Sequence, residues 1–200
     1  SATIDVSALS GIFNAKSIVS QGKQFPVAIK YAGESDIYHL PEMAARIAIQ
    51  ALREHDGDLL IFLPGEGEIK KCEDLLRNNV KGIAIHPLYG RLSQAKQNAA
   101  VFPDRNGKRK IVLATSIAET SLTIEGIKVV IDSGFGRTSK FDPRSGLTRL
   151  ETVLISKDSA DQRAGRAGRL SEGVCYRMWT QASHHNRPSH RNPEILEADL

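Results

Sequence analysis

Three short, almost purely apolar runs constrain the fold of this chain more than any other feature. They are DLLIFL at residues 58–63, KIVLAT at 110–115 and IKVVID at 127–132. A strand with one solvent-facing side alternates apolar and polar residues, whereas a strand covered on both faces is apolar almost throughout. We therefore expect a sheet with helices packed on both of its faces.

Amphipathic stretches of about ten residues separate strand-like segments, which is the spacing of βαβ units. The expected helices span residues 40–54, 68–77 and 93–102, and further strands are expected at 25–31 and 82–88. Crossover connections of this kind join parallel strands. The predicted fold class is α/β, with three layers and a mainly parallel sheet.

The pattern changes after residue 134. The sequence FDPRSG at 141–146 has the composition of a tight turn. With a strand expected at 148–155, it predicts a β-hairpin that projects from the sheet. A helix at 158–170 and a last strand at 173–179 are expected to follow.

The length of 200 residues suits one α/β domain with an additional segment. We expect the domain at residues 25–181, a neighbouring element at 1–24 and a polar linker at 182–200. No run approaches the roughly 20 apolar residues that span a bilayer, and the first residues do not resemble a secretory signal.

Charge and cysteine content say less about function. Cys72 and Cys175 have no metal-binding spacing and form no disulfide framework, so a reduced, cytoplasmic setting is expected. The net charge of +4 is compatible with phosphate or nucleic-acid partners but is common in proteins that have neither.

The sequence QRAGRAGR at residues 162–169 carries the strongest chemical signal. On a helix, Gln162, Arg166 and Arg169 lie on one stripe, with Arg163 about a quarter-turn away. Arginine offers forked donors to phosphate oxygens, and glutamine can orient a water molecule. This pattern predicts an arginine finger for a nucleoside triphosphate bound elsewhere.

Two glycines strengthen that interpretation. Gly165 and Gly168 together cost about 2 kcal/mol of helix propensity, and such positions often allow a backbone or a ligand to approach closely. The alternatives are a solvated basic helix face, which explains most arginine runs, and a generic nucleic-acid patch. Neither explains the glycines or the leading glutamine.

A second cluster, ATSIAETSLTIEG at residues 114–126, follows a buried strand. Open α/β sheets bind ligands beyond the carboxyl ends of their strands. Its hydroxyls are therefore candidates for phosphate or ribose contacts, although an ordinary polar loop is an equally good interpretation. These candidates are Thr115, Ser116, Thr120, Ser121 and Thr123.

Other motifs are incomplete or absent. The GEGE turn at 65–68 lacks the third glycine of a dinucleotide fingerprint, and in HPLYGRL at 86–92 a structural role is favoured. The sequence contains neither a GxxxxGK[ST] loop nor a DExH pair for magnesium. An arginine finger in a chain that has no P-loop must act on a nucleotide bound by another domain, across the interface between the two.

In this order the motifs resemble those of superfamily 2 helicases of the DEAH/RHA group. QRAGRAGR resembles their motif VI, ATSIAETSLTIEG motif V, LLIFLPGEGEI motif IV and Ser1-Ala2-Thr3 motif III. In motif V, Ser116 stands where many members have Asn, and Glu125 where many have Asp. FDPRSGLTRLETVLIS and PEILEADL are most similar to the bacterial HrpB-like branch.

The resemblance implies a RecA-like domain, which is a P-loop NTPase fold without its own P-loop. In this family two such domains clamp ATP, and RNA runs across both. The chain would be the second domain, with residues 1–24 forming the tail of the first and 182–200 leading into a winged-helix region.

The resemblance also implies roles for residues at the matching positions. Gln162 would position the attacking water, and Arg166 and Arg169 would contact the γ-phosphate. Thr123 and Glu125 would lie near the ribose or the nucleotide-bound metal, and Phe102 would stack on the base. ATP and Mg²⁺ are the implied cofactors, bound mainly by the first domain.

The implied partner is single-stranded RNA, with DNA left open, and no membrane. The expected RNA contacts are Gly65, Glu66, Gly90, Arg91 and Thr115. Contacts to the backbone make binding dependent on salt and tolerant of sequence. The hairpin around residues 141–150 would act near a duplex junction.

The leading hypothesis is thus the second motor domain of an ATP-dependent RNA helicase, inactive as an isolated fragment. One alternative is a non-catalytic RNA-binding or partner-docking module that keeps the fold. Another is a Rossmann-type enzyme, but Lys81-Gly82 is a poor fit to the acidic ribose ligand it needs.

Overall fold

The computed structural model describes residues 10–11, 16, 18, 25–34, 36–104, 106–119, 122–142 and 146–190, without the side chains of 141 and 142. The expected motif III at residues 1–3, Thr120, Ser121 and the segment 193–200 lie outside this part of the chain.

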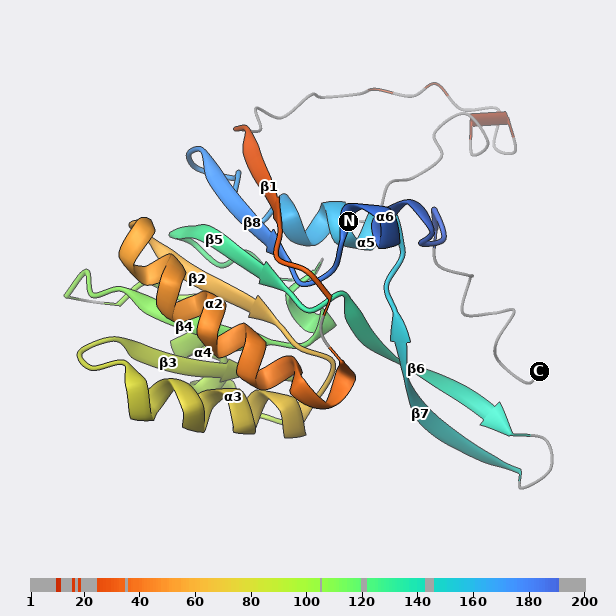
Figure 1. Ribbon diagram of the computed structural model, residues 1–200, viewed down its shortest axis with the longest axis horizontal. Coiled ribbons are helices and arrows are strands. Elements are labelled where there is room, and N and C mark those ends of the chain that lie inside the picture. The colour runs from red at the N-terminus through yellow and green to blue at the C-terminus, as the bar shows by residue number, and fades with distance from the viewer. Residues whose placement is uncertain are drawn as a thin grey trace.

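A six-stranded sheet forms the centre of the molecule, in the order β1-β8-β5-β2-β4-β3 (Figure 1). Every neighbouring pair is parallel. The strands are β1 (Val27–Tyr31), β2 (Asp58–Phe62), β3 (Ala84–Leu88), β4 (Lys110–Ala114), β5 (Ile127–Asp132) and β8 (Gly173–Arg177). The three apolar runs become β2, β4 and β5, side by side within the sheet, where Leu60 pairs with both Val112 and Val130.

Helices cover both faces of the sheet. α2 (Leu40–Glu54) and α3 (Glu66–Asn79) pack on one face, and α4 (Gln94–Val101) and α5 (Lys157–Ala164) pack on the other. Alternate residues of β2 serve the two cores, because Leu59 and Ile61 face the first pair of helices while Leu60 and Phe62 face the second. The predicted three-layer α/β fold is confirmed.

The hairpin consists of β6 (Phe135–Asp142) and β7 (Leu147–Leu154), which pair antiparallel and project away from the sheet (Figure 1). Its base is closed by a bond from the amide of Ile155 to the carbonyl of Gly134. Gly134 has a φ of 78°, which favours glycine at the sharp exit from β5. The predicted hairpin is therefore present.

Most boundaries differ from expectation by one or two residues, and two differences are larger. α5 ends at Ala164 rather than at residue 170, and the next residues form tighter i→i+3 bonds, such as Arg166 to Arg163. The start of the expected linker forms a short helix, α6 (Gln181–His185). Arg187 just beyond it is buried and donates to the carbonyls of Gly134 and Ile155, so this stretch packs on the domain.

Because all six strands run the same way, the sheet has two chemically distinct edges. We call the edge where strands end the carboxyl edge; the loops after β2, β3 and β4 and the hairpin after β5 leave from it. We call the opposite edge, where strands begin, the amino edge. None of the helices described is both long and apolar enough to span a membrane.

Candidate functional site

The segment from residue 162 to 169 is only partly helical. Gln162 is half-buried in the last turn of α5, whereas Arg166 and Arg169 follow the end of the helix. The predicted stripe of Gln162, Arg166 and Arg169 therefore does not form as an α-helical face. The tighter turns have about three residues each. The side chains of Arg163, Arg166 and Arg169 bond three residues that are close in sequence, Glu119, Leu122 and Thr123.

Arg163 is fully buried and paired. Its Nε lies 2.7 Å from a Glu119 oxygen, and its Nη1 lies 2.8 Å from an oxygen of Asp132 and 3.1 Å from the carbonyl oxygen of Phe135. Burial opposes the charge on this guanidinium, but the carboxylates of Asp132 and Glu119 outweigh it and raise the pKa of Arg163. These contacts are all within the domain, so Arg163 has a structural role here.

Arg166 is almost as deeply buried, with 5% of its surface exposed, but it faces neutral acceptors. Its Nη1 donates to the carbonyl of Leu122 at 2.5 Å, and its Nη2 donates to the carbonyl of Glu119. Burial and the nearby Arg169 lower the pKa of Arg166 to about 10, so it stays charged at neutral pH. A guanidinium has five N–H donors, which leaves three for a ligand.

Arg169 is exposed, and its Nη1 donates to the hydroxyl of Thr123 at 2.8 Å. The structure thus brings together two residues predicted to contact a nucleotide. Neither Arg166 nor Arg169 forms an ion pair with any residue that the structure describes. Two adjacent cations without a carboxylate partner fit a phosphate group.

Of the two close neighbours predicted for these glycines, a backbone or a ligand, the structure shows a backbone at Gly168. A Cβ on Gly168 would lie 2.5 Å from the carbonyl oxygen of Phe25, and the Phe25 amide donates to the Gly168 carbonyl at 2.9 Å. Gly165 caps the end of α5. The close neighbour that Gly168 requires is therefore the backbone leading into β1, and these glycines are not evidence for a ligand.

Phe102 and Glu125 lie at the amino edge around Lys110, the first residue of β4. The Lys110 ammonium donates to the carbonyl of Phe102 at 2.6 Å. Burial lowers the pKa of Lys110, and the carboxylates of Asp58, Asp104 and Glu125 partly oppose this shift. Phe102 is 61% exposed and Glu125 is also exposed, so both can reach a ligand.

The five residues predicted to contact RNA all lie at the carboxyl edge. Gly65 and Glu66 follow β2, Gly90 and Arg91 follow β3, and Thr115 follows β4. The Thr115 amide donates to the carbonyl of Leu88, the last residue of β3, at 3.2 Å. Bonding to Lys70 lowers the pKa of Glu66, and the nearby Tyr89 and Arg91 add smaller effects.

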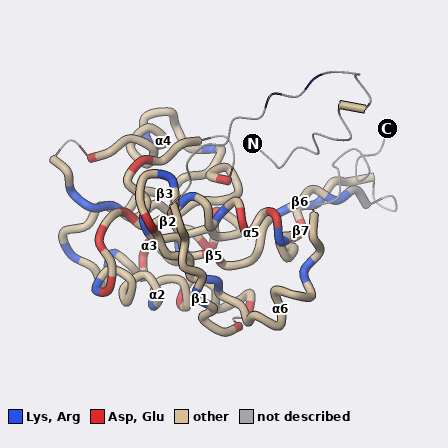
Figure 2. The backbone as a smooth tube through the Cα atoms, turned by 90° about the horizontal axis from the view of Figure 1, so that it is seen from above, with Lys and Arg blue, Asp and Glu red and all other residues tan. Residues whose placement is uncertain are grey.

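The hairpin contributes a basic residue to this edge that the motifs do not indicate. The Arg137 guanidinium lies against Gly65, where a side chain at residue 65 would collide with it, and it donates weakly to Glu68 at 3.4 Å. Lys140 and Arg149 continue the basic character along both strands (Figure 2). No local sequence pattern distinguishes Arg137 from other arginines, because its partner lies 69 residues away.

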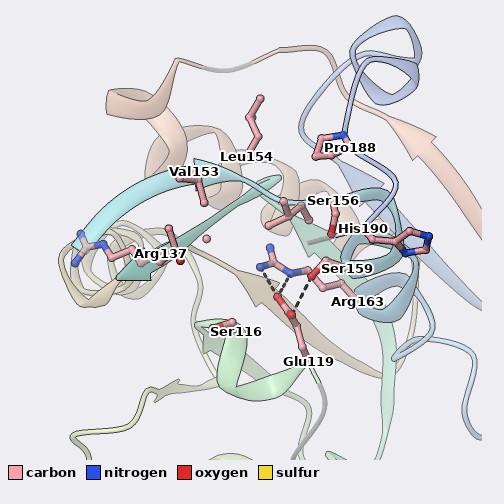
Figure 3. A pocket seen from close by; sticks show the side chains of 13 residues that line it. Ser116, Glu119, Arg137, Val153, Leu154, Ser156, Ser159, Arg163, Pro188 and His190 are labelled. Atoms are coloured by element: carbon pink, nitrogen blue, oxygen red, sulfur yellow. Dashed lines mark hydrogen bonds and ion pairs between the residues drawn. The ribbon is translucent and has the colours of Figure 1, made fainter. Parts of the chain in front are cut away.

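A pocket of about 250 Å³ lies between the base of the hairpin, the turn after β4 and α5 (Figure 3). Ser116, Glu119 and Ser159 form a polar wall with Arg163 behind it, and Val153 and Pro188 belong to an apolar wall. Glu119 accepts from Ser159 at 3.0 Å as well as from Arg163. In the sequence Glu119 is one acid in a polar loop, and nothing local marks it as the partner of Arg163.

Among the described residues, no group of three or more His, Cys, Asp or Glu side chains is arranged to hold a metal ion. The donors suited to a nucleotide are thus the cationic and hydroxyl groups of Arg166, Arg169 and Thr123.

Comparison with known proteins identifies close relatives. The family described as "Helicase conserved C-terminal domain" matches residues 42–171. The chain is 42% identical over 202 residues to ATP-dependent RNA helicase HrpB of Escherichia coli (strain K12), covering 100% of this chain and 25% of that protein. It is 43% identical over 207 residues to ATP-dependent RNA helicase HrpA of the same organism, covering 100% of this chain and 16% of HrpA.

The fold is also shared with a solved structure. The crystal structure of Escherichia coli DEAH/RHA helicase HrpB superposes with a TM-score of 0.92 at 42% identity, covering 100% of this chain and 26% of that chain. The chain therefore spans about a quarter of the length of HrpB and less of HrpA.

Proposed function

This chain belongs to the helicase conserved C-terminal domain family, and from that membership we propose that it is the second RecA-like motor domain of an ATP-dependent RNA helicase. The observation that carries the proposal is the pairing of Arg169 with Thr123 beside Arg166, a cationic cluster with no carboxylate partner among the described residues. Such a cluster suits the phosphates of a nucleotide bound by another domain.

In this site Arg166 and Arg169 donate to phosphate oxygens, and Gln162 orients the attacking water. The carbonyls of Glu119 and Leu122 hold the Arg166 guanidinium in place before the nucleotide arrives. Fixed donors of this kind lose little freedom on binding and stabilise charge that develops in the transition state. Bound ATP with Mg²⁺ would supply the transferable phosphoryl group.

Three further residues complete the proposed nucleotide site. Thr123 and Glu125 lie near the ribose or the metal, and Phe102 stacks on the base. The exposure of Phe102 and Glu125 around Lys110 supports these roles. Stacking without reading the base edges tolerates different nucleotides.

At the carboxyl edge, Gly65, Glu66, Gly90, Arg91 and Thr115 contact the backbone of single-stranded RNA. Their position on consecutive loops after β2, β3 and β4 supports this role, since a strand crossing that edge meets each loop in turn. Arg137 adds a cation next to Gly65. Contacts to phosphate and ribose position an RNA strand without selecting its sequence.

We propose further that residues 1–24 belong to the tail of the first motor domain and that 182–200 lead into a following domain. The first domain would supply the P-loop and the DExH box, and the two domains would close on ATP between them. The contacts of Arg187 support close packing of the start of this connection on the second domain.

Replacement of Arg166 tests the proposal. In the full-length protein, Arg166→Ala should lower RNA-stimulated ATP turnover about a thousandfold, because a removed arginine finger typically costs that much. The affinity for single-stranded RNA should change only a few-fold. Arg77→Ala is a matched control, since Arg77 is exposed on α3 and pairs with Glu73.

Unchanged turnover in Arg166→Ala would contradict the proposal and support a non-catalytic RNA-binding or partner-docking module. One observation favours that second candidate: Leu147, Leu150 and Leu154 on β7 are between 55% and 65% exposed. This chain alone should hydrolyse ATP negligibly, and helicase-like turnover by the pure chain would also contradict the two-domain site.

A further inference from the structure

We propose that Glu119 is a positioning residue that links the RNA-binding carboxyl edge to Arg166, so that RNA binding regulates the placement of the finger. The inference rests on the proposed function, because it assigns a regulatory connection between the two proposed sites. Nothing in the sequence motifs singles out Glu119 for this role.

Hydrogen bonds from four directions converge on Glu119. Its side chain accepts from Arg163 at 2.7 Å and from Ser159 at 3.0 Å. Its amide donates to the carbonyl of Ser116 at 2.9 Å, and its own carbonyl accepts from Arg166. One residue therefore contacts α5, the turn after β4 and the proposed finger.

The turn after β4 begins at the carboxyl edge. It is the 3₁₀ helix η2 (Ser116–Ala118), and the carbonyl of Thr115 accepts from the amide of Ala118 at 3.2 Å. Thr115 is a proposed RNA contact, and Glu119 directly follows this turn. A displacement of Thr115 thus reaches Glu119 through a single hydrogen-bonded turn.

The position of Arg166 depends on the backbone that follows this turn. Its two acceptors are the carbonyl of Glu119, directly after the turn, and the carbonyl of Leu122. When this backbone moves, the guanidinium must move with it or lose both hydrogen bonds. Because Arg166 is 95% covered, a lost bond is not readily replaced by water.

The opposite side of Glu119 is anchored by Arg163. That guanidinium also bonds Asp132 at the end of β5 and the carbonyl of Phe135 at the start of the hairpin. A shift of the hairpin is therefore transmitted to Glu119 through Arg163. Two proposed RNA-contacting regions, the hairpin and the turn after β4, meet at one carboxylate.

The surroundings leave room for movement. Glu119, Ser116, Ser159 and Arg163 all line the 250 Å³ pocket at the base of the hairpin (Figure 3). A fully packed interior resists displacement of its side chains, whereas an adjoining cavity lets a polar cluster adopt a second arrangement. Two distant sites are coupled when the residues between them can adopt two discrete arrangements.

The test measures the ratio of RNA-stimulated to basal ATP turnover in the full-length protein. Glu119→Gln removes the charge that holds Arg163 but keeps the Glu119 carbonyl that holds Arg166. The ratio should fall roughly tenfold, within the usual range of coupling between two sites. Basal turnover should fall by a smaller factor than stimulated turnover, and the affinity for single-stranded RNA should change less than about threefold.

Two further variants separate positioning from folding. Ser159→Ala deletes one bond to Glu119 and leaves its pair with Arg163 intact, so the ratio should fall by a smaller factor, about threefold. Glu119→Asp retains the charge and should restore part of the ratio. Asp56→Asn is the matched control, since Asp56 forms an exposed pair with Lys128 and should not alter the ratio.

Two results would contradict the proposed role of Glu119. If Glu119→Gln lowers basal and stimulated turnover in the same proportion, or if Ser159→Ala leaves the ratio unchanged, Glu119 has only a structural role. A wild-type protein without RNA-stimulated turnover would instead contradict the proposed function itself.

Discussion

The two edges of the sheet present arginine in different ways. Toward the amino edge, Arg166 is held by two carbonyl oxygens with 5% of its surface exposed, and the exposed Arg169 donates to Thr123. At the carboxyl edge, Arg91 and Arg137 are exposed on a loop and on the hairpin. The proposed nucleotide site therefore includes one arginine held inside the fold, whereas both arginines of the proposed RNA site lie on the surface.

This difference has a physical consequence. A buried guanidinium is held by hydrogen bonds from the fold, so its position is fixed before a ligand binds. An exposed one is solvated and adapts to its ligand at little cost. Substitutions at the amino edge should thus affect stability and activity together, and those at the carboxyl edge should affect mainly binding.

The largest difference in stability should separate Arg163 from Arg137. Arg163→Ala should lower the free energy of unfolding by about 3–5 kcal/mol, because it leaves the carboxylates of Asp132 and Glu119 without their cation. Arg137→Ala should cost at most about 1 kcal/mol, since its 3.4 Å pair with Glu68 is partly solvated. Urea denaturation measures both, and equal losses would remove the distinction between buried and exposed arginines.

A smaller difference in stability is expected between substitutions of two glycines. Gly168→Ala should destabilise the protein by about 1–3 kcal/mol, because the new methyl group meets the backbone of Phe25. Gly90→Ala should change stability by less than about 1 kcal/mol, since nothing lies within 4 Å of its Cβ position. Thermal denaturation measures both effects, and a well-tolerated Gly168→Ala would contradict the close packing of the amino edge.

The smallest effect concerns the dependence of RNA binding on salt. If Arg91 and Arg137 each neutralise one phosphate, replacing either by Ala should reduce the slope of log affinity against log salt by about 0.7. Arg169→Ala should leave the slope unchanged because it lies at the other edge. Titrations of single-stranded RNA at several salt concentrations give the slopes, and a reduced slope for Arg169→Ala would assign RNA to both edges.

Much of the fold could be predicted from local patterns. The helix expected at residues 40–54 is observed with those bounds, because Ala44, Ile47, Ala48 and Ala51 place one apolar face toward the sheet. The strand at 127–132 is likewise as expected. Each of these patterns lies within a single helix or strand, so it can be recognised without knowing which elements pack against it.

The end of α5 could not be predicted in this way. Helical spacing continues past Ala164, but Gly168 packs on Phe25 and Arg166 bonds the carbonyls of Glu119 and Leu122. These contacts draw the chain into tighter turns. The packing of the stretch after Gln181 could not be predicted for a similar reason, because it depends on Arg187, which is buried over the ring of Trp179 at 4.2 Å.

The sequence by itself determined the buried strands, the layers of helices and the motifs that assign the chain to its family. It also determined that the loops with Gly65, Gly90 and Thr115 leave the same edge of the sheet, because each follows a parallel strand. Only the tertiary structure decided which arginines are buried, paired or free to meet a ligand. The reason is that Arg163 finds Glu119 and Asp132 at separations of 44 and 31 residues, and such partners are chosen by packing rather than by local spacing.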